Sequence, residues 1–223
     1  MASSATAARR PAARSAPWWR DPVRLAKPVV FLAALVPAGR LLHGVFVDPE
    51  ALGANPAETI EHVTGDWALH FLLLTLAVTP LRRLTGWNGA IKFRRMLGLF
   101  AFFYGVLHMA AYVAFDMNLD AAAIVKDIWK RPFVTVGFAS LLLMTPLAIT
   151  STRGWVLRLG GAAWSRLHQL VYPVAILGVV HYWWLVKRDI TWPVIYGTVL
   201  AVLLGYRVWQ RLRPRPARAR AGA

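Results

Sequence analysis

The 223-residue sequence contains no cysteine. This absence excludes disulfide bonds, thiolate-held iron–sulfur clusters and the covalent attachment of c-type haem, because all three need a cysteine sulfur. Any metal or cofactor must therefore be held by histidine, methionine, tyrosine, carboxylate or backbone groups.

Negative charge is also scarce: ten Asp and Glu stand against 26 Lys and Arg, a formal net charge of +16. A balance this basic is compatible with a nucleic-acid partner, but the positions of the charges indicate another origin. Basic residues gather in segment 1–27, in loops 82–95 and 153–166, and in the tail from 207 to 220. The 47–66 loop, in contrast, carries acidic residues and no Lys or Arg.

Long apolar runs are the main positive feature of the sequence. Hydrophobic residues make up 57% of the chain, and the mean hydropathy is +0.47, which is too apolar for a soluble domain of this length. A run of roughly 20 apolar residues spans a bilayer, and lipid offers the backbone no hydrogen-bond partner, so each run is predicted to be a helix. The expected spans are residues 28–46, 66–83, 96–115, 132–150, 166–186 and 191–211.

The loops between these runs predict the topology. Basic loops alternate with acidic or neutral ones, as six spans with both termini on the cytoplasmic side require. The predicted fold is an all-α integral membrane protein with a six-helix domain over 28–211, between a basic, disordered leader (1–27) and an Arg-rich cytoplasmic tail (212–223). The other interpretation of the leader is a cleaved signal peptide. The tail is interpreted as an anchor near anionic lipid and not as a nucleic-acid arm, because no nucleic-acid-binding module accompanies it.

Histidines within the spans are the first candidates for function, because an ionisable residue in the bilayer is costly. His108 lies about 12 residues above the start of its span and His181 about 14 above the start of its own, so both imidazoles are expected at similar depth, to within about 5 Å. Two axial ligands of one haem iron need such a match, and neutral imidazole is a good iron ligand. The alternative for His168 and His181 is a pair of unrelated histidines, one interfacial and one bonded to a neighbouring helix.

His168 and Arg94 are candidates for a second site, at the inner edge of the same two spans. Fourteen helical steps separate Arg94 from His108, which leaves the two side chains only about 40° apart around the helix axis. The two residues are therefore predicted to share a side of their helix. On a straight helix, the 13 steps from His168 to His181 leave the two side chains roughly 140° apart around the helix axis. This predicts a kink or twist near Pro173 or a separate role for His168. A guanidinium does not ligate iron. It suits a haem propionate, a flavin phosphate or a lipid phosphate, and the other interpretation is an ordinary positive-inside arginine.

Three further histidines allow two interpretations each. His70 either reaches the level of His108 and His181 or is an interfacial histidine. His62, and His43 with Arg40, either line a polar site for a quinone head group or are solvated or lipid-facing.

Several segments together resemble those of a known family. They are EHVTGDWALHFLLLTLAVTPLRR, RRMLGLFAFFYGVLH, RPFVTVG, LAITS and LHQLVYPVAILGVVHYWW. On these segments the sequence is similar, from residue 28 to about 211, to the MsrQ (formerly YedZ) family, the haem-binding membrane subunits of the bacterial MsrPQ methionine-sulfoxide reductase. The wider superfamily, the ferric-reductase-like transmembrane domain, places two histidines on each of two helices. Three of these positions match His108, His168 and His181, and Arg94 stands in the fourth.

The resemblance implies a function in electron transfer across the bacterial inner membrane. It implies haem b, one or two per chain, together with FMN, although no local FMN motif is visible. Electrons are expected from the quinone pool or a cytoplasmic flavin reductase. They are expected to pass to a periplasmic molybdopterin subunit, MsrP-like, which reduces methionine sulfoxide in oxidised proteins. The chain itself is then an electron-transfer subunit with no substrate-reducing centre of its own.

Two other functions are compatible with the residues. A proton- or metal-coupled transporter would use intramembrane histidines as a relay, although no internal repeat of the kind such folds show is evident. A stand-alone ferric reductase is the third interpretation. It is disfavoured because the chain ends shortly after the sixth span, which leaves no room for a nucleotide-binding domain.

Overall fold

The computed structural model describes residues 22–186 and 189–213, and within these ranges the secondary structure is helical, with no strand. The predicted leader, up to residue 21, and most of the predicted tail lie outside the described residues. The long helices are α1 (Pro22–Phe46), α2 (Pro56–Thr85), α3 (Arg94–Ala111), α5 (Pro132–Ile149), α8 (Val171–Leu185) and α9 (Thr191–Leu212). The shorter helices are α4 (Ala121–Lys130), α6 (Arg153–Leu159) and α7 (Gly161–Leu167). Short 3₁₀ and π turns are η2 (Pro49–Leu52), η3 (Asn88–Lys92), η4 (Tyr112–Asp116) and η5 (His168–Leu170).

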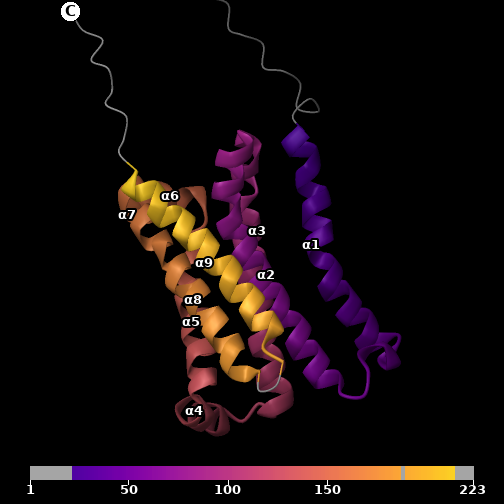
Figure 1. Ribbon diagram of the computed structural model, residues 1–223. Helices are drawn as coiled ribbons and strands as arrows, with labels where there is room; N and C mark the ends of the chain where they lie inside the picture. The colour runs from indigo at the N-terminus through magenta and orange to yellow at the C-terminus, as the bar shows by residue number, and fades with distance from the viewer. Residues whose placement is uncertain (1–21, 187–188, 214–223) are drawn as a thin grey trace, which may run out of the picture.

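The long helices run between two ends of the molecule (Figure 1). One end holds the start of α1, the end of α9, and α6 and α7, and is called the α6 end. The opposite end holds α4 and is called the α4 end. Because the described chain starts and finishes at the same end, it crosses between the ends an even number of times.

Five stretches of the described chain are long and apolar enough to cross a membrane: α1, α2, α5, α9 and the stretch Asn88–Asp116 that contains α3. Helix α8 has only 15 residues, but η5 and α7 precede it without a break. The six predicted apolar runs therefore correspond to α1, α2, α3, α5, α8 and α9. This arrangement is that of an all-α, multi-pass membrane protein, as predicted.

The boundaries differ from the prediction where polar residues form helix. Helix α1 begins at Pro22 and not at residue 28, and α2 begins at Pro56 and not at residue 66. Asn55 caps α2 by accepting a hydrogen bond from the Glu58 backbone N–H, and Pro at the first helical position needs no partner for its nitrogen. In the predicted loops 116–131 and 153–166, Asp120 caps α4 and Thr152 caps α6 in the same way.

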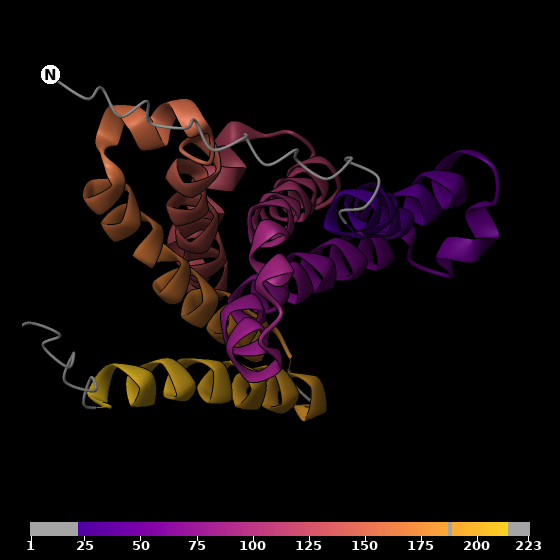
Figure 2. The ribbon, with the colours of Figure 1, turned by 90° about the horizontal axis from the view of Figure 1, so that it is seen from above.

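The core lies between four helices, with α2 packed on α3 and α5 packed on α8. Figure 2 shows α1 and α9 outside this group, α1 beside α2 and α9 across α2 and α8. Leu76, Ala101, Tyr104, Val174 and Ala175 are fully buried at the centre. Many large apolar side chains of α1 and α9 are exposed, as lipid-facing helices require.

A tyrosine hydroxyl attaches α1 to this core. Pro37 interrupts the backbone hydrogen bonding of α1, and the Tyr104 hydroxyl of α3 lies beside the interruption. It donates to the Ala34 carbonyl at 2.7 Å and accepts from the Ala38 N–H at 3.2 Å. These two groups are partners in a regular helix, so the hydroxyl inserts at the turn that proline weakens.

An arginine has the corresponding role at a proline of α2. Pro80 has no N–H to give to the Leu76 carbonyl four residues earlier. Arg207 of α9 donates to that carbonyl at 2.7 Å and to the Leu203 carbonyl at 3.1 Å, and its guanidinium lies 5.5 Å from the Tyr172 ring centre. Arg207 therefore joins α9 to α2.

Replacement of Tyr104 by Phe should destabilise the protein by about 1–3 kcal/mol, because the buried Ala34 carbonyl and the half-buried Ala38 N–H lose a partner. The free energy of unfolding of the purified protein in detergent measures this loss. Tyr172→Phe is the matched control, since the Tyr172 hydroxyl makes no hydrogen bond to any described residue. Equal stability of the two variants would contradict the role given to Tyr104.

Candidate functional site

Two cavities lie along the four-helix core, and the predicted site residues divide between them. The cavity toward the α4 end, called the histidine cavity, has a volume of about 230 Å³ and is lined by His108 and His181. The cavity toward the α6 end, called the arginine cavity, has a volume of about 690 Å³ and is lined by Arg94 and His168. Leu72 and Met144 line both and so form the wall between them.

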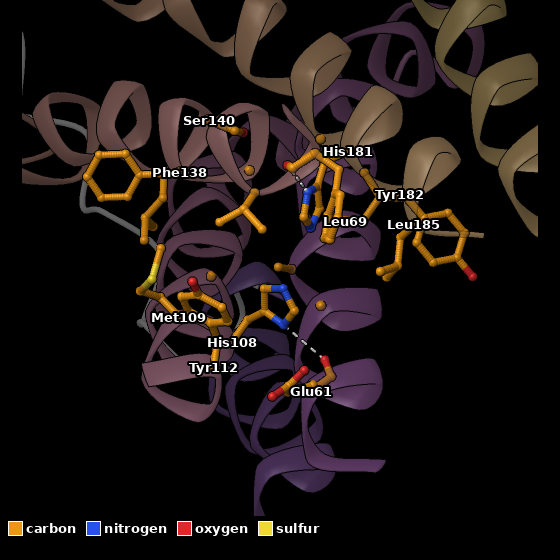
Figure 3. A pocket seen from close by; sticks show the side chains of 18 of the residues that line it. Glu61, Leu69, His108, Met109, Tyr112, Phe138, Ser140, His181, Tyr182 and Leu185 are labelled. Atoms are coloured by element: carbon orange, nitrogen blue, oxygen red, sulfur yellow. Dashed lines mark hydrogen bonds between the residues drawn. The ribbon is translucent and has the colours of Figure 1, made fainter. Parts of the chain in front are cut away.

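The two imidazoles of the histidine cavity face each other (Figure 3). Their ring centres are 6.0 Å apart, and the ring planes are inclined by 73°. A metal bound at about 2 Å by one nitrogen of each ring places the ring centres roughly 6 Å apart. Helices α3 and α8 thus bring the two histidines to the same level, at a distance that one metal can bridge.

Backbone carbonyls fix which nitrogen of each ring is free. His108 Nδ1 lies 3.0 Å from the Glu61 carbonyl oxygen and His181 Nδ1 lies 2.7 Å from that of Phe133. A carbonyl oxygen only accepts, so each Nδ1 carries the proton and each neutral ring keeps a lone pair on Nε2. Both histidines are therefore in the tautomer that binds a metal through Nε2.

Glycines of the opposite helices make room for the two rings. A Cβ on Gly137 of α5 would lie 2.7 Å from His181 Nδ1, and one on Gly65 of α2 would lie 3.2 Å from His108 Cε1. Each ring therefore rests on helix backbone that only glycine leaves uncovered. Sequence reasoning did not single out these glycines; the available signal was a glycine inside an otherwise apolar run.

The α4 end of the histidine cavity is closed by polar groups. The Tyr112 hydroxyl donates to Asp127 Oδ2 at 2.6 Å, and Arg131 pairs with the same carboxylate. The Arg131 guanidinium holds the pKa of the Asp127 carboxyl below its usual range, while burial acts in the opposite direction. Glu61 Oε1 and Arg131 Nε are buried in the cavity wall with no hydrogen-bond partner among the described residues. This end can therefore accept a group with a polar edge.

His168 is held differently from the other two histidines. Its ring stacks on Trp164 with the centres 3.9 Å apart, and its Nε2 lies 3.1 Å from Thr150 Oγ1. The Thr150 hydroxyl gives its proton to the Pro146 carbonyl at 2.6 Å, so it accepts from His168 Nε2–H. The free lone pair of His168 is thus on Nδ1.

The positions of His168 and His181 resolve the mismatch noted along their span. The 3₁₀ turn η5 (His168–Leu170) separates α7 from α8 close to Pro173. The two histidines line different cavities, and Arg94 shares the arginine cavity with His168, as their similar depth predicts. The roles of all four residues as cofactor or metal ligands stay predictions.

The other predicted histidines lie outside this arrangement or at its edge. His62 lines the histidine cavity. His70 lines neither cavity, and its Nε2 is 3.0 Å from the Tyr196 hydroxyl. Arg40 and His43 are exposed on α1 and line neither cavity.

The histidine cavity does not provide a complete metal site made of side chains alone. The described part of the chain has no group of three or more His, Asp or Glu residues that could hold a metal ion. The two imidazoles could supply two ligands, one from the free Nε2 of each ring. A metal bound between them must bring its remaining ligands with it, as the iron of a macrocycle does.

Comparison with known proteins shows which family the sequence is similar to. A family model described as "Ferric reductase like transmembrane component" matches residues 64–179. A protein of Herminiimonas arsenicoxydans named "Protein-methionine-sulfoxide reductase heme-binding subunit MsrQ" is 54% identical over 84% of this chain and 87% of its own length. Proteins with the same name from Xanthomonas oryzae pv. oryzae (strain MAFF 311018) and Azospira oryzae are each 52% identical. They cover 90% and 86% of this chain, and 94% and 84% of their own lengths.

Replacement of Gly137 by Ala should displace the His181 ring from the Phe133 carbonyl, because the new Cβ would overlap Nδ1. Overpacking of this kind typically costs about 1–3 kcal/mol, and the free energy of unfolding measures it. Gly205→Ala in α9 is the control, since nothing lies within 4 Å of the added Cβ. Its stability should be unchanged or higher by up to about 1 kcal/mol. A Gly137 variant as stable as the control would show that the ring does not rest on this backbone.

Proposed function

Because the chain belongs to the MsrQ family of protein-methionine-sulfoxide reductase heme-binding subunits, we propose that it is a membrane electron carrier with a b-type haem in the histidine cavity. The observation that carries the proposal is the 6.0 Å separation of the His108 and His181 rings, with each Nδ1–H directed to a carbonyl. In this proposal His108 and His181 would hold the iron through their free Nε2 atoms.

The cavity residues fit such a group. Leu69, Leu141 and Met144 give apolar walls, and Gly105 and Gly178 on α3 and α8 leave space between the helices. Bound haem would supply iron that changes its charge by one electron. The Glu61 and Phe133 carbonyls, by accepting from Nδ1–H, hold each ring in orientation and increase the basicity of Nε2. The apolar walls exclude water and so contribute to the reduction potential.

A second cofactor is proposed for the arginine cavity. His168 and Arg94 would contact it there, and the family resemblance suggests FMN or a second haem. Arg94 would hold a phosphate or a propionate and would not ligate iron, because a guanidinium has no free lone pair.

The distribution of charge suggests the direction of transfer. Arginines gather at the α6 end, whereas Asp48, Glu50 and Glu58 lie near the α4 end. On the positive-inside rule, we propose that the α6 end, where the described chain starts and finishes, faces the cytoplasm of a bacterial inner membrane. Electrons would enter at the α6 end from the quinone pool or a cytoplasmic flavin reductase. They would leave at the α4 end to a periplasmic molybdopterin reductase subunit, MsrP-like, that repairs methionine sulfoxide in proteins.

Replacement of His108 or His181 by Ala should reduce bound haem to less than about a tenth of the wild-type amount, since loss of even an outer-shell partner costs 10–100-fold in metal affinity. The Soret absorbance of purified protein, with haem quantified as the pyridine haemochrome, measures this. His70→Ala is the control, because His70 lines neither cavity, and it should keep the wild-type spectrum. A wild-type protein with no Soret band would refute the proposal and favour a transporter with a histidine relay.

A further inference from the structure

His70 of α2 is a half-buried histidine that lines neither cavity. Its Nε2 lies 3.0 Å from the hydroxyl oxygen of Tyr196, a buried residue of α9. Its Nδ1 is buried and has no hydrogen-bond partner among the described residues. An imidazole inside a membrane helix is costly and is a candidate for function. The bond between His70 and Tyr196 is therefore a feature that the two cavities do not explain.

The phenol of Tyr196 is the donor in this bond. If His70 Nε2 carried the proton, both the Tyr196 hydroxyl proton and the Nδ1 lone pair would lack a partner among the described residues. With the proton on Tyr196, the Nδ1–H is the one group left unpaired. Each buried polar group without a partner costs free energy, so the second arrangement is preferred. The Tyr196 O–H thus points at the lone pair of a neutral imidazole.

Two other tyrosines donate hydrogen bonds to weaker bases. Tyr104 donates to a backbone carbonyl, which does not take up a proton. Tyr112 donates to the carboxylate of Asp127, which is already paired with Arg131. A neutral imidazole, in contrast, accepts a proton near neutral pH. Tyr196 is the described tyrosine whose hydrogen bond ends on such a base.

A base at this distance changes how the phenol can be oxidised. A phenol keeps its proton at neutral pH, and loss of an electron alone would leave a cation of high energy in a weakly polar surrounding. Transfer of the proton to His70 Nε2 in the same step avoids that cation. Asp66 lies one turn before His70 on α2 and interacts with it electrostatically, so it would stabilise the imidazolium that forms.

Aromatic rings connect Tyr196 to the surface and to the histidine cavity. Trp192, one turn earlier on α9, has its ring centre 6.1 Å from that of Tyr196 and is 54% exposed. The ring centre of Tyr182 on α8 lies 5.4 Å from that of Tyr196, and Tyr182 lines the histidine cavity. Electron transfer weakens steeply with distance, so these neighbouring rings form a short route between the surface and the cavity.

We propose that Tyr196 and His70 form a redox-active pair, through which the exposed Trp192 reduces one-electron oxidants of the lipid peroxyl radical class at the membrane surface. Trp192 lies at the start of α9, near the α4 end (Figure 1), where tryptophan is typical of the membrane–water interface. An oxidant formed in lipid can reach it there.

The electrons and protons balance in each step. The peroxyl radical takes one electron from Trp192 and one proton from the aqueous phase, and becomes a hydroperoxide. Tyr196 then gives one electron to the oxidised Trp192 and its phenolic proton to His70 Nε2, which leaves a neutral tyrosyl radical. One electron from the histidine cavity, through Tyr182, and the proton from His70 restore the phenol. This last step rests on the proposed function, and the earlier steps do not.

The first test generates the oxidant with light. The oxidised, full-length protein in detergent is flashed with tris(bipyridine)ruthenium and persulfate, then frozen for electron paramagnetic resonance. The wild type should show a neutral tyrosyl radical, whose spectrum narrows when the tyrosine rings are deuterated. In Tyr196→Phe the radical should stay on tryptophan. Tyr172→Phe is the matched control and should keep the tyrosyl signal, since the Tyr172 hydroxyl makes no hydrogen bond to any described residue.

A second variant separates a proton acceptor from a structural partner. His70→Gln keeps an oxygen that can accept from the Tyr196 hydroxyl, but an amide oxygen does not hold the proton. The tyrosyl radical should form about 100-fold more slowly in this variant, the scale of a positioned general base. In the wild type the same step should be slower in heavy water, because a proton moves with the electron.

A third experiment tests the class of oxidant. Vesicles that contain the reduced protein and a peroxyl-sensitive fluorescent lipid are treated with a lipid-soluble azo initiator. The wild type should slow the loss of fluorescence, and Trp192→Phe should remove most of this protection. Trp129→Phe is the matched control, because Trp129 is also an exposed tryptophan of the α4 end and should leave the protection unchanged.

Three results would overturn the inference. They are a tyrosyl signal in Tyr196→Phe equal to that of the wild type, an unchanged rate in His70→Gln, and equal protection by the Trp192 and Trp129 variants. The light-driven radical is measured in oxidised protein without reference to the Soret band. A chain without haem could therefore still show it, so that failure here is distinguishable from failure of the haem proposal.

Discussion

Two hydrogen bonds from histidine rings to backbone carbonyls fix the geometry of the histidine cavity. They join His108 to the Glu61 carbonyl of α2 and His181 to the Phe133 carbonyl of α5. A carbonyl that is still part of a helix is a rigid acceptor, so each ring is fixed in orientation and in tautomer. The two free Nε2 atoms follow from this constraint, and they form the opposed pair of nitrogens that we propose would hold the iron.

The same constraint explains why the four central helices pack as they do. Each histidine must reach the backbone of a neighbouring helix, and glycine at Gly65 and Gly137 permits that approach. The outer helices are attached by polar groups at prolines: Tyr104 holds α1 beside Pro37, and Arg207 holds α9 beside Pro80. Lipid offers no hydrogen-bond partner, so without these bonds the backbone groups beside the two prolines would stay unpaired in the membrane.

Much of this architecture could be predicted from the sequence, because apolar length and histidine depth are one-dimensional properties. They predicted the six long helical segments, the common level of His108 and His181, and the shared cavity of His168 and Arg94. The start of α2 at Pro56, and helices α4 and α6, were missed because these segments are too polar to read as membrane spans. The glycine contacts and the Thr150–His168 bond were missed because they join residues that sequence spacing does not relate.

The most direct measurement of the central claim is pulsed electron paramagnetic resonance of the oxidised, purified protein with ¹⁵N-labelled histidine. If the rings of α3 and α8 share one iron, the spectrum will be that of a low-spin ferric centre, with hyperfine coupling to the nitrogens of two imidazoles. A high-spin centre, or coupling to a single imidazole, would contradict the account.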